Sequence, residues 1–283
     1  MPLVYVCIMP HGGEVIADLA TKYTVRKFSK TREGMREVAR QVARSRPDTV
    51  IIASPHNLRL WGRIGIVTAA NSTGRLQASP RNPKSVTVKA KCDVELAKQL
   101  LERAQRRNLP VVGANYGSSE GTASDLPMDW GTIIPLWFIF KACKRKPRIV
   151  IVTPSREIPL KENHALGRVI ADVATKNRSK RIVFVASSDQ AHAHRKSSSF
   201  GFNRAARVYD NIVLDAIKNN DIQSILKIRP SVIDGAKPDS LWQMAILAGI
   251  ASKIPLRSHV YSYQVPTYYG MICAGFQRGS RDS

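Results

Sequence analysis

The chain has 283 residues and a hydrophobic content of 43%, which is enough for a sizeable core and excludes wholesale disorder. Its 44 Lys and Arg against 21 Asp and Glu give a formal net charge of +23, and such an excess attracts anions such as nucleic acid, phosphate or carboxylated small molecules. No apolar run reaches the roughly 18 residues of a membrane-spanning helix, and the start MPLVYVCIMP lacks the basic residues of a signal peptide, so we expect a cytoplasmic protein with no membrane partner.

Short apolar runs rich in β-branched residues alternate with amphipathic stretches along the chain. The apolar runs predict buried strands at residues 3–10, 49–53, 63–69, 148–153 and 181–186. The amphipathic stretches predict helices at residues 32–46, 94–107, 163–176 and 203–218, the first with Thr31 as its N-cap. This alternation predicts an α/β fold with a mostly parallel central sheet flanked by helices on both faces.

The remaining segments show no internal repeat and no low-complexity linker, so we expect residues 1–283 to form a single domain. The polar stretch 70–86 is expected to be an irregular excursion from the sheet. Two segments after residue 257, SHVYSYQ and GMICAGF, predict closing strands.

Two histidines stand directly beyond predicted strands. His11 lies in the sequence PHGGE after the first strand, and His56 lies in SPH after the second. Because ligands of open α/β sheets collect beyond the carboxyl ends of the strands, we expect both side chains at one site. Imidazole binds iron, zinc, copper and nickel, so the pair indicates a metal centre. The alternative for either histidine is a capping or packing role.

The predicted strand at residues 181–186 leads into the sequence SSDQAHAH. In this loop His192 is a candidate general acid/base, and Asp189 is a candidate for orienting its ring. His192 and His194 also form an HxH pair that would suit a metal ion. The remaining alternative is a polar loop with no role in a site.

Five motifs follow one another along the chain: PHGGE, SPH, SSDQAHAH, DSLWQMAILAGI and PTYYGMICAGF. Together they resemble the class III (LigB-type) extradiol ring-cleavage dioxygenase superfamily, which also contains the Memo-like proteins, and the resemblance extends over residues 10–276. It implies a class III extradiol dioxygenase-like domain with Fe(II) as the usual cofactor; another divalent metal such as zinc would suit the same ligands. The implied substrates are a catechol-type aromatic compound and O2, and a homo-oligomer is expected.

The resemblance also implies roles for single residues. His11 and His56 match the two metal-binding histidines of the family, and His192 matches its acid/base. Asp239, just before the apolar helix near the C-terminus, occupies the place of the third ligand, where the family has Glu or His. The alternative for Asp239 is to cap that helix.

The expected substrate pocket departs from the family at one position. Many members carry Asp-His-Gly where this chain has Asp-Trp-Gly, with Trp130 at the centre. A tryptophan ring can stack on an aromatic substrate and its N–H can donate, but it cannot accept a proton. Tyr268 and Tyr269 are expected to border the pocket. His194 is either a second contact for substrate and protons or a residue that faces outward.

These observations predict a non-haem Fe(II)-dependent extradiol dioxygenase that opens a catechol-type ring with O2, and the positive charge would favour a carboxylated catechol. One alternative, favoured by Trp130, is a Memo-like metal-binding protein without ring-cleavage activity. Another is a nucleic-acid-associated basic protein with a decayed site. Basic clusters at residues 141–148 and 176–181 favour the latter, although neither has the interleaved aromatic residues of a single-strand binding platform.

Overall fold

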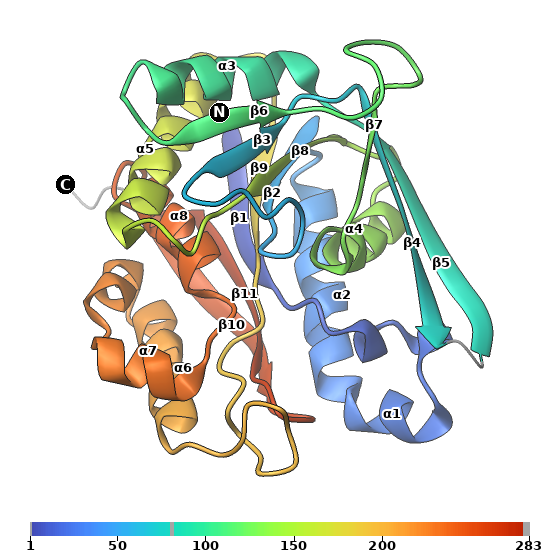
Figure 1. Ribbon diagram of the computed structural model, residues 1–283, viewed down its shortest axis with the longest axis vertical. Helices are drawn as coiled ribbons and strands as arrows, with labels where there is room; N and C mark the ends of the chain where they lie inside the picture. Colours follow the sequence, from blue (N-terminus) through green and yellow to red (C-terminus); the bar gives the residue numbers. More distant parts are fainter. Residues whose placement is uncertain (1, 80–81, 280–283) are drawn as a thin grey trace.

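A large mixed sheet forms the centre of the protein in this computed structural model, which describes residues 2–79 and 82–279 (Figure 1). Within these ranges the sheet has eight strands, in the spatial order β10 (Leu256–Gln264), β11 (Met271–Arg278), β1 (Leu3–Met9), β9 (Ile182–Ser187), β2 (Thr49–Ala53), β8 (Arg148–Thr153), β3 (Ile64–Val67) and β6 (Val111–Ala114). The central strands β1, β9, β2 and β8 are parallel, whereas β11 runs antiparallel to β1, and β3 runs antiparallel to β8. The predicted α/β fold with a parallel sheet centre is confirmed.

Both faces of this sheet are covered, as the near-continuous apolar strands require. Alternate residues of each central strand point to opposite sides, so that Ile51 packs in one core and Ile52 in the other. The first core lies under α3 (Val94–Gln105), α5 (Leu160–Lys176), α6 (Ala205–Lys218), η3 (Ile222–Lys227), α7 (Pro230–Ala236) and α8 (Leu241–Ala251). The second lies under α2 (Ser29–Arg44) and α4 (Trp130–Ala142), preceded in the chain by η1 (Gly13–Val15), η2 (Ala17–Leu19) and α1 (Lys22–Lys27).

A small second sheet packs beside α4, and it contradicts one expectation. The described residues within 70–86 are not an irregular excursion, because β4 (Asn71–Ser79) and β5 (Asn82–Lys91) pair as antiparallel strands, and β7 (Asp125–Pro127) pairs in parallel with β4; residues 80 and 81 lie outside the described ranges. The sequence did not predict β4 and β5 as strands, because polar residues outnumber apolar ones in both. Only one face of the hairpin is buried, where Val86 and Val88 join the second core.

The start of α2 differs from the expectation, and helix α4 was not expected. Helix α2 begins at Ser29, so Thr31 lies inside its first turn and is not the N-cap; its hydroxyl instead donates to Oε1 of Gln264, 2.8 Å away. Helix α4 was not predicted, because it is apolar on all sides and contains Pro135. No helix in the described part of the chain is long and apolar enough to cross a membrane.

Candidate metal centre and catalytic cleft

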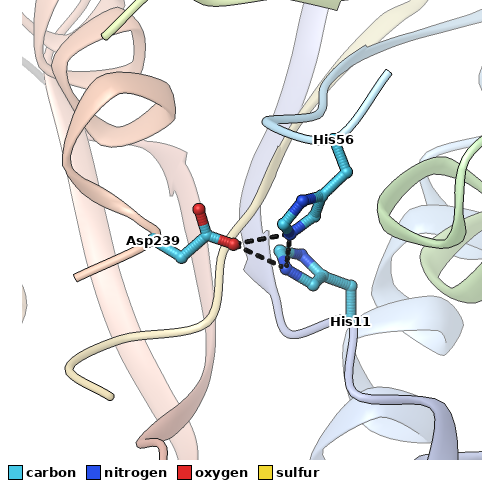
Figure 2. A group of neighbouring side chains, drawn as sticks. All are labelled: His11, His56 and Asp239. Atoms are coloured by element: carbon cyan, nitrogen blue, oxygen red, sulfur yellow. Dashed lines mark hydrogen bonds and ion pairs between the residues drawn. The ribbon is translucent and has the colours of Figure 1, made fainter. Parts of the chain in front are cut away.

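The side chains of His11, His56 and Asp239 meet beyond the carboxyl ends of the central strands (Figure 2). His11 follows β1 and His56 follows β2, and these strands both pair with β9, which lies between them. The two Nε2 atoms lie 3.1 Å apart. Oδ2 of Asp239 lies 3.3 Å from Nε2 of His11 and 2.6 Å from Nε2 of His56. The structure therefore brings the three predicted ligands together.

The spacing of these three atoms suits one divalent cation. Metal bonds of about 2.1 Å at right angles to one another separate neighbouring donor atoms by about 3.0 Å. The observed separations of 2.6–3.3 Å bracket this value. Two imidazoles and one carboxylate on one face of a metal are the donor set of non-haem Fe(II) oxygenases, and they leave the opposite face open. The residues present fit such an ion.

A chain of hydrogen bonds fixes which nitrogen of His11 is available to a metal. Pro135 has no N–H to donate to the carbonyl of Gly131 four residues earlier in α4. The Ser187 hydroxyl donates to that carbonyl instead, at 2.5 Å. Since its proton is committed there, Ser187 Oγ accepts the Nδ1–H of His11 at 2.9 Å, and Nε2 keeps its lone pair for the centre.

The second histidine is held neutral by its surroundings. Burial, together with the neighbouring His11, lowers the pKa of His56 to about 4. Its ring stacks on Trp130, with centroids 4.2 Å apart. Trp130 is the first residue of α4, and the preceding Asp129 caps this helix by accepting the backbone N–H of Thr132. The neutral imidazole is the form that binds a metal.

Asp239 does not cap α8, since Ser240 stands at the N-cap of this helix and no side chain caps it. Its carboxylate instead forms an ion pair with Arg156, a residue that sequence reasoning missed. The guanidinium of Arg156 also lies 4.8 Å from the ring centroid of Trp242. Arg156 is the third residue after β8, just as His56 is the third residue after β2, so the same strand-end rule could have found it.

Asp189 lies at the centre but does not orient His192 as expected. Its Oδ1 accepts the backbone N–H of His11 at 3.0 Å, and its Oδ2 lies 3.5 Å from Nε2 of the same residue. Nδ1 of His192 lies 2.9 Å from the carbonyl oxygen of Gln190, which can only accept. This carbonyl therefore holds the proton on Nδ1 and leaves Nε2 as the basic atom. Burial lowers the pKa of His192, so the ring is neutral at pH 7.

An aromatic cleft of about 330 Å³ surrounds His192 and the three candidate ligands. The His192 ring stacks on Tyr269 at 5.3 Å between centroids and meets Phe200 edge-on at 5.2 Å. Tyr268 and Trp130 complete the aromatic lining. Phe200, on the long loop between β9 and α6, had not been predicted to contribute. The cleft suits a flat aromatic ligand next to a base.

His194 lies outside this lining and does not face solvent freely. Its Nε2 lies 2.9 Å from Oδ2 of the buried Asp210. Asp210 also accepts the Tyr263 hydroxyl and the backbone N–H of Ala191. His194 does not line the cleft, so its expected contact with substrate stays a prediction, and its largely buried side chain does not face outward. The interaction fixes the loop that carries His192.

Comparison with known proteins identifies the family to which this chain belongs. Protein CA_C1420 of Clostridium acetobutylicum is 23% identical over 257 residues, which are 91% of this chain and 54% of that protein, so the chain spans about half the length of this relative. The crystal structure of an uncharacterized protein, JW3007 from Escherichia coli K12, has a similar fold, with a TM-score of 0.60 and 14% identity over 96% of this chain and 99% of that one. The model of the catalytic LigB subunit of aromatic ring-opening dioxygenase matches residues 5–276. The chain therefore belongs to the LigB family, within the class III extradiol dioxygenase superfamily.

Proposed function

We propose that this protein is a non-haem Fe(II)-dependent extradiol dioxygenase that opens a catechol-type ring with O2. The observation that carries the proposal is the convergence of His11 Nε2, His56 Nε2 and Asp239 Oδ2 within 4.8 Å of one another, in a cleft that also holds His192. Family membership supports the class of reaction. Two histidines and a carboxylate suit Fe(II) and also occur in hydrolytic zinc sites, so the preference for iron rests on the family.

His11, His56 and Asp239 would hold the metal, and Asp189 would keep the His11 backbone in place. Bound Fe(II) would supply the redox chemistry that lets a catecholate react with O2. His192, neutral and with Nε2 unprotonated, would accept a proton from a substrate hydroxyl and return it to an oxygen atom as the ring opens. Both oxygen atoms of O2 end in the ring-opened product.

The cleft walls set the substrate class. Phe200, Tyr268 and Tyr269 surround the His192 ring and would sandwich an aromatic substrate. Trp130 adds a fourth ring where many relatives have a proton-accepting histidine, which leaves His192 as the base of the cleft. The net charge of +23 would concentrate an acidic catechol near the protein, so we propose a carboxylated catechol.

The test is anaerobic loading with Fe(II), followed by air and a panel of neutral and carboxylated catechols. Ring opening is followed by the yellow absorbance of the product and by O2 uptake. We expect activity in the wild-type protein and none in His11→Ala, which loses the metal. His192→Gln is expected to bind iron normally and to lose most of the activity. No ring-opened product from an iron-loaded wild-type protein would reject the proposal.

A second candidate is a Memo-like metal-binding protein without ring-cleavage activity. Two contacts favour it: Trp130 stacks on one candidate ligand, and Arg156 pairs with another. Both would restrict the open face of a bound ion. Stoichiometric iron binding that requires His11 and Asp239, without turnover of any catechol, would support this candidate.

A further inference from the structure

A cavity of about 730 Å³ lies between the ends of α2 and α4, and we call it the basic hollow. Its walls come from the last turn of α2, the turn before β2 and the loop before β8. These segments precede the strands whose other ends carry the metal-binding cleft. Helix α4 connects the two places: Trp130 at its start stacks on His56, and Ala142 at its end lines the hollow. A helix of 13 residues separates them by about 20 Å.

Five basic side chains line the basic hollow: Arg40, Arg44, Arg46, Lys144 and Arg145. Arg40 is already paired, because its Nε and Nη2 both donate to Glu37. For the other four, no carboxylate of the described residues lies within ion-pair distance. Four cations thus line one concave surface, on which Asp48 is the acidic residue.

Two nearby negative features offset only part of this charge. Asp48 is the acidic residue of the lining, and its Oδ2 already accepts the backbone N–H of Arg181. The C-termini of α2 and α4 both end at the hollow, and each contributes about half a negative charge. Against four unpaired cations, these features leave an excess of about two positive charges.

None of the basic residues at 176–181 lines the basic hollow. Lys180 is bound by Asp93 and Glu95, and Nε of Arg181 donates to the carbonyl of Ser45. A nucleic-acid backbone would need a longer stripe of free cations. The volume of the hollow instead lies within the roughly 300–1,000 Å³ range of small-ligand sites.

We propose that the basic hollow binds a compact anion that carries two or more phosphate groups. Arg44, in the last turn of α2, and Arg145, in the loop before β8, would form forked hydrogen bonds with phosphate oxygens. Lys144 and Arg46 would add charge, and the small apolar side chains of Ala43 and Ala142 leave room for the rest of the ligand. This site is independent of the proposed ring-opening reaction.

The test is isothermal titration of the full chain with inorganic tripolyphosphate at physiological salt. The double variant Arg44→Gln/Arg145→Gln removes two cations of the hollow. The control Arg168→Gln/Arg229→Gln removes two exposed cations elsewhere, so the net charge is the same in both. We expect the hollow variant to bind about tenfold more weakly or worse, and the control to stay within about twofold of wild type. His11→Ala should bind like wild type, which excludes chelation of a bound metal as the source of the heat.

Equal losses in the two double variants would overturn the proposal, since only net charge would then attract the anion. An absence of tripolyphosphate binding to the wild-type protein would overturn it too. A duplex DNA of about 20 base pairs forms the second arm of the test. Binding of DNA with a steep salt dependence, but not of tripolyphosphate, would assign the surface to nucleic acid and reject a small-ligand site.

Discussion

The Ser187 hydroxyl accepts the Nδ1–H of His11 at 2.9 Å, and it can do so because its own proton is donated to the Gly131 carbonyl. That carbonyl is free because Pro135, four residues later in α4, has no N–H. A proline in helix α4 thus determines the tautomer of a histidine in the loop after β1. The lone pair of His11 Nε2 points to His56 and Asp239 as a result.

Ser187→Ala is expected to weaken metal binding about 10- to 100-fold, because Nδ1 of His11 would lose the acceptor that fixes its proton. Affinity can be measured by competition with a coloured chelator. Ser188→Ala is the matched control, since the neighbouring Ser188 Oγ is buried and has no hydrogen-bond partner among the described residues. Equal affinities of the two variants would show that the Ser187 contact does not orient the ligand.

His192→Gln is expected to lower kcat/KM about 100- to 10,000-fold while leaving the iron content unchanged. The pH profile of the wild-type enzyme offers a second measurement. Burial lowers the pKa of His192, so its neutral, proton-accepting form persists to lower pH than in an exposed histidine. The acid limb of kcat/KM should therefore lie below about pH 6.5. His259→Gln, at an exposed position of β10, is the control and should behave as wild type. An acid limb above pH 7 would contradict this role of His192.

Trp130→Ala is expected to raise the KM for a catechol about 3- to 10-fold with a smaller change in kcat, because one aromatic wall of the cleft is lost. The side chain is 46% exposed, so its removal should cost little stability. Trp61→Ala serves as the control, since Trp61 is 86% exposed and does not line the cleft. An unchanged KM in Trp130→Ala would mean that the substrate binds away from this ring.

The sequence could predict the parts of the fold in which one clear pattern of apolar residues marks the element. Buried parallel strands such as β2 are apolar throughout, and their ends carry His11 and His56 in a pattern that the sheet geometry explains. Asp239 has no such pattern, and the family resemblance supplied it. It reaches the site because the segment before α8 packs across the strand ends, which only the tertiary structure shows.

The features that the sequence could not predict depend on contacts with backbone atoms or on strands with very few apolar residues. The partner of His192 is the carbonyl of Gln190, and no side-chain motif reveals a carbonyl acceptor. Asp189 was the nearest acidic residue in sequence, but the turn directs it to His11. The hairpin of β4 and β5 was missed because Val86 and Val88 are too few to reveal an alternating pattern among polar residues.

Asp93→Asn is expected to destabilise the protein by about 1–3 kcal/mol at pH 7, because Asp93 is buried and accepts hydrogen bonds from Thr49 and Lys180. Burial raises the pKa of this carboxyl, but the bonds from Thr49, Lys180 and the Leu96 N–H lower it by more, so that the net pKa lies below its usual value. A lowered carboxyl pKa means that the ionised form is the stabilising one. Its contribution is complete above about pH 4 and is lost as the pH falls through the lower, folded-state pKa.

The free energy of unfolding, measured with urea from pH 7 down to pH 3, should therefore differ between wild type and Asp93→Asn at neutral pH, and the difference should shrink below about pH 4. Asp234→Asn makes the same charge change at an exposed position and should have no effect. If the difference in unfolding free energy between wild type and Asp93→Asn stays constant across this range, the substitution acts through shape or packing and not through the loss of charge. If the effect of Asp93→Asn shrinks with falling pH and Asp234→Asn has no effect, the acid sensitivity arises at the contact between Lys180 and Asp93, just before α3. This contact lies away from the metal centre.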